Sequence, residues 1–309
     1  MLPELKIQID RLKAMDWLDA ASEPSTSDLE VSPTDDLLES LIGQATIPAV
    51  LGGRYEMKSL MAEGGFSQVW RALDRSLGRP VAVKVTTVNC YSEARRVAQL
   101  KHHGIVTVHD VGNADNLCYI VFDLVEGHTL EEQIRLETLD WRQSARIVRE
   151  VAQSVQFAHN KGFIHRDIKP ANILIDESGA PILTDFGIAV TECELRHEAM
   201  TSVGTLAYMA PEQLQPGKSI DVRTDVYGLG VVFYELLTGR RPFSQSTLSA
   251  LRAAILAGAP PAPRSLNSAI PEPVERICLK CLSPKREDRY PHAKDLAEAI
   301  AQQLASSES

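Results

Sequence analysis

The sequence has few cysteines and no long apolar run, and each absence excludes a class of protein. Its five cysteines are scattered over 309 residues. Such usage is typical of a reducing compartment and not of a disulfide-stapled secreted domain. The most apolar window, residues 227–239, contains glycines and Glu235 and is too short to span a bilayer. Because the first residues do not resemble a signal peptide either, we expect a cytoplasmic protein without a membrane segment.

The sequence also lacks an excess of basic residues and any internal repeat. Its formal net charge is -9 at pH 7, which argues against a nucleic-acid-binding protein. The negative charge is concentrated at the start, because residues 1–53 contain ten acidic and three basic residues. Cys278 and Cys281 have the spacing of half a zinc site, but a second pair is missing. We therefore interpret them as two packed cysteines on a helix.

The hydrophobic pattern changes twice along the chain. Residues 3–20 have apolar residues at helical spacing and are followed by a linker rich in Ser, Thr, Pro and acidic residues. Five short alternating runs between residues 54 and 125 predict an antiparallel sheet, interrupted by one helix near residues 91–101. Beyond residue 128 the pattern becomes helical. We thus expect an α+β protein with the following parts: an acidic arm (1–53), a main domain (54–305) with a small β-rich lobe (54–126) and a larger helical lobe (127–305), and a tail (306–309).

A dense polar segment, FIHRDIKPANILI (163–175), lies within the helical part. Asp167 could orient an attacking hydroxyl and accept its proton, and Lys169 could neutralise a phosphoryl group in transfer. Asn172 is a neutral oxygen ligand suited to magnesium. Ten residues later, ILTDFGIA supplies Asp185 as a carboxylate ligand for the same kind of ion.

Two further charged residues could belong to the same site. Lys84 lies in the apolar strand VAVKV, where it is either an exposed edge lysine or a cation that holds phosphates. Glu93, on the predicted helix, could fix that lysine by pairing with it. The connection between them, TTVNCYSE, is short, so the helix must begin early or Lys84 must remain unpaired with it.

The stretch MAEGGFSQVW (61–70) resembles a phosphate-covering loop with the pattern G-x-G-x-x-G-x-V, but two glycines are missing. Ala62 takes the first glycine position and Ser67 takes the third, whereas Gly64 is retained in the middle. Both replacements are small, so the backbone could still approach a phosphate, and Ser67 could donate a hydrogen bond. An intact glycine pattern is itself a weak signal.

Taken together, these motifs resemble the protein-kinase superfamily, and in particular the bacterial serine/threonine kinases of eukaryotic type. HRDIKPAN followed by DFG at family spacing is the most specific match. The resemblance extends over about residues 54–305, and it includes three further segments: YMAPEQ (208–213), DVRTDVYGLGVVFYELLTGRRPF (221–243) and CLSPKREDRY (281–290). It implies the bilobal kinase fold.

The resemblance also implies a role for each matching residue. Asp167, Lys169, Lys84 and Glu93 would be catalytic, and Asn172 and Asp185 would hold the metal. Phe122 would close the rear of the adenine pocket, and Val97, Val108, His165 and Phe186 would stack into an internal column. The nucleotide would be bound by Ala62, Gly64, Ser67, Val69, Ala82, Lys84, Phe122, Asp123, Val125 and Leu174.

Other matching residues would act on the segment that follows DFG. Arg166, taken as buried, would seek an anion such as a phosphorylated residue, for which Thr201 and Ser202 are the candidates. Thr205 would bond to Asp167 and Lys169. Three residues would be structural: Glu212 paired with Arg289, and Asp225 anchoring the catalytic loop.

The implied function is transfer of the ATP γ-phosphoryl group to serine or threonine hydroxyls of proteins. ATP would be used with Mg²⁺, or with Mn²⁺ in its place, and the chain would phosphorylate its own activation loop, which implies self-association. We expect protein substrates, and neither nucleic acid nor membrane as partners. Two alternatives are open: a pseudokinase that binds nucleotide or acts as a scaffold, and a small-molecule phosphotransferase. The arm is either a disordered acidic tail or a docking helix.

Overall fold

The computed structural model describes residues 47–64, 67–87, 94–95, 97–114, 117–185 and 203–306. The chain divides into two units, residues 1–37 and 38–309, and every described residue belongs to the second unit. The helix expected over residues 3–20, the linker after it and the tail from residue 307 onward therefore lie outside the described residues.

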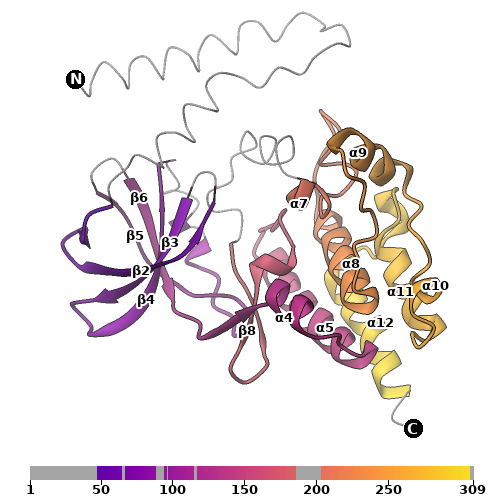
Figure 1. Ribbon diagram of the computed structural model, residues 1–309, viewed down its shortest axis with the longest axis horizontal. Helices are drawn as coiled ribbons and strands as arrows, with labels where there is room; N and C mark the ends of the chain where they lie inside the picture. The colour runs from indigo at the N-terminus through magenta and orange to yellow at the C-terminus, as the bar shows by residue number, and fades with distance from the viewer. Residues whose placement is uncertain are drawn as a thin grey trace, which may run out of the picture. The chain divides into compact units, whose positions relative to one another are not determined.

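A six-stranded antiparallel sheet forms the first part of the fold (Figure 1), with the spatial order β1-β2-β3-β4-β6-β5. The five strands predicted from the alternating sequence pattern are β2 to β6, while β1 was not predicted because it is only two residues long. Of the helix predicted near residues 91–101, the structure describes residues 94, 95 and 97 as helical. The strands are β1 (Val50–Leu51), β2 (Tyr55–Glu63), β3 (Ser67–Asp74), β4 (Arg79–Thr86), β5 (Val108–Ala114) and β6 (Leu117–Asp123).

The sheet has two apolar faces because successive side chains of a strand point to opposite sides. One face packs into a core of its own, made of Leu51, Tyr55, Ala72, Val81, Val83, Val85, Leu117, Tyr119 and Val121. Ile120 and Phe122 of β6 belong instead to the larger core that continues into the helices. Lys84 pairs in register with Ile120 and alternates with Val83 and Val85, so it lies on this second face.

A three-stranded sheet and a group of helices make up the remainder. The small sheet has the order β7-β8-β9, and its strands were not predicted because each has only three or four residues. Its strands are β7 (Gly127–Thr129), β8 (Ile173–Asp176) and β9 (Pro181–Leu183). The helices are α4 (Leu130–Leu136), α5 (Trp141–Asn160), η1 (Pro170–Asn172), α7 (Val203–Leu206), α8 (Arg223–Thr238), α9 (Leu248–Ala257), α10 (Pro263–Leu266), α11 (Glu272–Cys281), η2 (Arg286–Asp288) and α12 (Ala293–Ser306).

Helix α8 is the central element of the helical part. It is buried on all sides, as expected of a helix that is apolar around its whole circumference, and it contacts α5, α10, α11 and α12 (Figure 1). It ends at Gly239, whose φ of 68° is left-handed and therefore suits glycine. Within the described ranges, no helix combines the length and the apolar character needed to cross a bilayer.

Cys278 and Cys281 pack against α8 from α11, and both are fully buried. The Cys278 thiol lies 3.7 Å from the backbone oxygen of Gly230. Burial raises the pKa of the Cys281 thiol to about 12. A reactive thiol is exposed and readily ionised, and Cys281 is neither. The sequence interpretation of two packed helical cysteines agrees with this arrangement.

Glycine at position 230 permits this close helix contact, so Gly230→Ala should destabilise the protein. The added Cβ would lie 2.5 Å from Cβ of Cys281 and 3.3 Å from its carbonyl carbon. Forcing α8 and α11 apart should cost about 1–3 kcal/mol in the free energy of unfolding, more than the ~1 kcal/mol that alanine contributes to helix propensity. Urea denaturation measures the change. Gly228→Ala, whose Cβ would lie 3.0 Å from Ile168, should lose less, and equal losses would contradict the argument.

Candidate active site

Asp167 lies at the centre of a small polar cluster between α5 and β8. Lys169 Nζ is 2.8 Å from Asp167 Oδ2. Asn172, at the end of η1, donates from Nδ2 to Asp167 Oδ2 and to the backbone oxygen of Asp167, at 2.8 Å each. Because both amide hydrogens of Asn172 are directed at Asp167, its Oδ1 is the atom that can accept a cation.

Lys84 and Asp185 connect the six-stranded sheet with the loop after β9. Lys84 is only 9% exposed, and its Nζ lies 2.8 Å from Asp185 Oδ1. Burial opposes ionisation of Asp185, but the Lys84 ammonium outweighs it and holds the pKa of Asp185 below its ordinary value. Asp185 also has a φ of 55°, a left-handed conformation that costs energy in a non-glycine residue and that recurs at functional sites.

A buried carboxylate, Asp225 of α8, fixes the backbone that precedes Asp167. It is 1% exposed and accepts hydrogen bonds at 2.8 Å from the backbone N–H groups of His165 and Arg166. His159 Nε2 of α5 lies 2.7 Å from the same carboxylate. Two backbone N–H groups with a common acceptor constrain the turn in which Arg166 adopts its φ of 69°.

The Asp167 loop and the Asp185 loop are bonded to each other through Thr184. The Thr184 N–H donates to the backbone oxygen of Asn172 at 2.9 Å. His165 Nε2 lies 2.9 Å from the backbone oxygen of Thr184. The carboxylates of Asp167 and Asp185 are therefore carried by two loops with a shared hydrogen-bond network.

The residues expected to bind adenine lie on neighbouring elements. Val69 of β3 pairs with Lys84, and Ala82 of β4 pairs with Phe122. Phe122 is 6% exposed and belongs to the large core. Val69, Ala82 and Leu174 are half-buried, as is Val125, whereas Asp123 is exposed and its carboxylate lies 2.5 Å from His109 Nε2.

The altered glycine loop lies where β2 and β3 meet. Ala62 pairs with Val69, and the Gly64 N–H donates to the backbone oxygen of Ser67 at 2.8 Å. Strand pairing therefore continues up to Glu63 and Gln68 without glycine at positions 62 and 67. Gly65 and Phe66, between them, lie outside the described residues.

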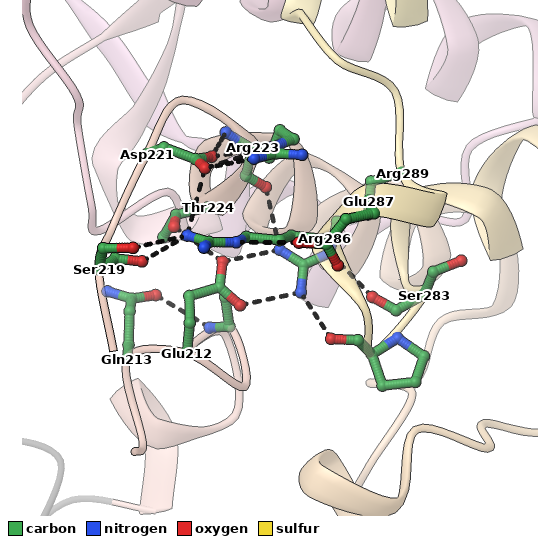
Figure 2. Close-up of polar contacts among 12 residues, drawn as sticks. Glu212, Gln213, Ser219, Asp221, Arg223, Thr224, Ser283, Arg286, Glu287 and Arg289 are labelled. Atoms are coloured by element: carbon green, nitrogen blue, oxygen red, sulfur yellow. Dashed lines mark hydrogen bonds and ion pairs between the residues drawn. The ribbon is translucent and has the colours of Figure 1, made fainter. Parts of the chain in front are cut away.

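Glu212 and Arg289 form a bidentate ion pair in the helical part (Figure 2). Arg289 Nη1 and Nη2 lie 2.8 Å and 2.9 Å from the two carboxylate oxygens of Glu212. The Arg289 side chain is completely buried, and Thr224 of α8 donates to Glu212 Oε1 at 2.8 Å. Burial raises the pKa of Glu212, but the bonds from Arg289 outweigh it and leave the pKa below its ordinary value.

Several expected site residues lie outside the described residues: Glu93, Phe186, Thr201 and Ser202. Their proposed roles stay predictions. Of the internal column, Val97, Val108 and His165 are described and buried.

One expectation differs from the structure. Arg166 was taken to be buried, but it is exposed, although Asp225 fixes its backbone N–H. The expected bonds of Thr205 to Asp167 and Lys169 stay a prediction. Asp167 is contacted by Lys169 and Asn172.

Three polar residues near the site were missed by the sequence analysis. His159 contacts Asp225, Gln213 donates from Nε2 to the backbone oxygen of Arg166 at 2.8 Å, and Glu126 pairs with Arg71 of β3 at 2.6 Å. Each contact joins segments far apart in the sequence, and none of the three residues stands in a pattern of its own that would have singled it out.

Comparison with known proteins identifies the class that this fold and site define. The family model described as "Protein kinase domain" matches residues 55–303, so the chain belongs to the protein kinase family, whose members use ATP and a divalent cation. This membership and the β-rich and helical parts confirm the α+β kinase fold expected from the motifs.

Three bacterial proteins illustrate the similarity. The chain is 34% identical over 275 residues to the probable serine/threonine-protein kinase PknB of Bifidobacterium longum, covering 82% of this chain and 40% of that protein. It is 34% identical over 262 residues to the serine/threonine-protein kinase PrkC of Bacillus subtilis, covering 81% and 40%. The serine/threonine-protein kinase PknB of Mycobacterium tuberculosis is 34% identical over 269 residues, covering 81% and 43%. The chain thus spans about two fifths of these relatives' length.

Arg289→Met should destabilise the protein in a pH-dependent way. At pH 7 the variant would leave Glu212 charged and buried without its partner, which should cost about 3–5 kcal/mol in the free energy of unfolding. In the wild type the lowered pKa of Glu212 contributes stability that is present above the ordinary glutamate pKa and is lost as the pH falls through the folded-state value. In the variant an unpaired buried carboxyl has a raised pKa, so the difference between the two proteins should shrink as the pH falls.

Chemical denaturation at several pH values measures this difference. The double variant Glu212→Gln/Arg289→Met is the control, because it leaves no charge on either member of this buried pair and should lie closer to the wild type at pH 7 than Arg289→Met does. A deficit of Arg289→Met that stays constant between pH 7 and pH 4 would contradict the argument.

Proposed function

We propose that this chain is a serine/threonine protein kinase, which transfers the γ-phosphoryl group of ATP to serine or threonine hydroxyls of proteins. The observation that carries the proposal is the arrangement of five polar side chains in two linked groups. Asp167 lies 2.8 Å from Lys169 and from Asn172, and Lys84 lies 2.8 Å from Asp185, which is 101 residues away in the sequence. The Thr184 N–H, which donates to the backbone oxygen of Asn172, joins the loops that carry the two groups. Each of the three relatives named above is called a serine/threonine-protein kinase, which supports the choice of hydroxyl.

Asp167 and Lys169 are proposed to act on the substrate. Asp167 accepts the hydroxyl proton or orients the hydroxyl toward the γ-phosphorus, and its carboxylate is held for this by Asn172. Lys169, adjacent to that carboxylate, neutralises charge on the phosphoryl group. Positioned charges of this kind supply most of the catalysis in phosphoryl transfer. Lys84 binds the α- and β-phosphates, with Glu93 as its partner when nucleotide is bound.

The oxygen atoms near Asp167 fit Mg²⁺, with Mn²⁺ as a substitute. Asn172 Oδ1 and the second carboxylate oxygen of Asp185 are both hard ligands of the type these ions bind, and the lowered pKa of Asp185 keeps that carboxylate ionised. Asn172 and Asp185 would hold the cation, which would neutralise negative charge on the phosphates when bound.

The remaining assignments belong to the same proposal. The kinase domain extends over residues 54–305. Nucleotide is bound by Ala62, Gly64, Ser67, Val69, Ala82, Lys84, Phe122, Asp123, Val125 and Leu174. A second copy of the chain phosphorylates Thr201 or Ser202, and Arg166, which is exposed, is the proposed partner of the resulting phosphate. Protein substrates are the partners, and the cytoplasm is the expected location.

A pseudokinase is the alternative, and the altered glycine loop is the observation that favours it. The pairing of Ala62 with Val69 weakens that alternative, since the strands that carry the loop form without the two glycines. The platform formed by Glu212 and Arg289 disfavours a small-molecule phosphotransferase, because the resemblance associates these residues with binding of peptide substrates.

Asp167→Asn should strongly reduce the rate of phosphate transfer while leaving the fold intact. Loss of the proton acceptor should lower the rate by about 10²–10⁴, measured as phosphate incorporation from Mg-ATP with mass-spectrometric mapping of the sites. Asp288→Asn, which changes an exposed aspartate of η2, is the matched control and should match the wild type. Equal incorporation by Asp167→Asn and wild type would refute the catalytic assignment, and modified sites lying only outside residues 191–205 would refute autophosphorylation of that loop.

Restoring the two glycines tests the loop itself. The double variant Ala62→Gly/Ser67→Gly should change the Michaelis constant for ATP by a modest factor of about 2–5, with little change in kcat, because the loop covers the phosphates and adds no reacting group. Steady-state kinetics separate the two constants. If the wild type were inactive and the double variant active, the pseudokinase alternative would be correct.

A further inference from the structure

Ser219 lies in an exposed loop before α8, and an arginine side chain contacts its hydroxyl. Residues 216–219 are all exposed, and Gly217 turns the chain there with a φ of 77°. Arg286 Nη1, from η2, donates to the Ser219 hydroxyl at 3.1 Å and to the Ser219 backbone oxygen at 2.6 Å (Figure 2). A serine hydroxyl is therefore already in contact with a guanidinium group.

The Arg286 guanidinium could turn from its present acidic neighbours toward a phosphate on Ser219 without leaving a buried carboxylate unpaired. Asp221 is shared by two arginines: Arg223 contacts it three times, at 2.7, 3.1 and 3.2 Å, and Arg286 approaches to 3.2 Å. If Arg286 turned toward a new anion, Arg223 would still neutralise Asp221. Glu287, the other acidic neighbour of Arg286, is 66% exposed and 3.4 Å away, so it can move into solvent.

We propose that Ser219 is a phosphorylation site of this chain and that Arg286 holds the resulting phosphate. The proposal rests on the kinase function proposed above, with a second copy as the enzyme. The Ser219 oxygen forms a bond to the γ-phosphorus of ATP while the bond from that phosphorus to the β,γ-bridging oxygen breaks. ADP leaves, and the hydroxyl proton passes to Asp167 of the enzyme copy. A phosphate offers Arg286 charge-assisted bonds that the neutral hydroxyl does not.

The phosphate should reinforce the contact between two loops that support the Glu212–Arg289 pair. Arg286 and Arg289 belong to one turn, and Arg289 also donates to the backbone oxygen of Arg223 at 3.1 Å. Gln213, next to Glu212, donates to the backbone oxygen of Arg166. The modified serine would thus lie in a region bonded to the loop that carries Asp167, and the expected effect is a stabilised folded state.

The test uses the full chain carrying Asp167→Asn as substrate and the wild-type chain with Mg-ATP as enzyme. Peptide mapping should find phosphate on Ser219 at about tenfold or more the occupancy of Ser178. Ser178 is a matched exposed serine in a turn, but its hydroxyl donates to the carboxylate of Asp176 at 2.6 Å, where a phosphate would be repelled. Absence of phosphate from every site would refute the kinase function itself. Phosphate on other residues but not on Ser219 would overturn this inference alone.

The holding role of Arg286 has its own measurement. The Asp167→Asn chain and the Asp167→Asn/Ser219→Ala chain are each compared before and after treatment with the wild-type enzyme. Treatment should raise the midpoint of thermal unfolding of the first chain by about 1–3 °C more than that of the second. The extra gain should disappear when Arg286→Ala is added to the first chain. A lowered midpoint on Ser219 modification would mean that repulsion from Asp221 dominates, and the proposal would be wrong.

Discussion

The hydrogen bonds that the buried carboxylate of Asp225 accepts determine the conformation of the loop around Asp167. Asp225 lies on α8, the helix that is surrounded by the rest of the helical part, and it receives the N–H groups of His165 and Arg166 together with the ring of His159. A buried charge persists only when its hydrogen bonds are satisfied. The loop therefore has to take the one conformation that delivers these donors, including the left-handed backbone of Arg166.

From that anchor the arrangement extends outward by short contacts. The His165 ring contacts the backbone oxygen of Thr184. The Thr184 N–H donates to the backbone oxygen of Asn172, and the Asn172 side chain donates to the Asp167 carboxylate. Asp185 follows Thr184 directly and pairs with Lys84 on the sheet. Among the described residues, Asp167, Asn172 and Asp185 are thus linked to α8 by a chain of main-chain and side-chain hydrogen bonds, while Lys84 lies on the sheet. Preorganisation of this kind is what an electrostatic mechanism requires.

The sequence predicted those strands and site residues that belong to a recognisable local pattern. The strands β2 to β6 alternate clearly, and HRDIKPAN and DFG stand close together in the sequence, so both the fold class and the cluster around Asp167 were accessible. The strands β1 and β7 to β9 were missed because they are too short to show a period. The contacts of Asp225 with His159 and of Gln213 with Arg166 were missed because they depend on tertiary packing. The burial assigned to Arg166 was wrong for the same reason, since the sequence does not reveal what covers a side chain.

The full burial of α8 has a consequence for how the chain folds. A helix that is apolar on every side has no stable place in water until its neighbours arrive, and α11 and α12, which contact it, are the last helices described. During synthesis from the N-terminus, the sheet with its separate core could fold early, while α8 would wait for about seventy further residues to be made. Through this interval its apolar surface would be open to chaperones or to other chains. The helix that anchors the Asp167 loop in the folded protein would therefore be an exposed apolar segment while the following helices are still missing.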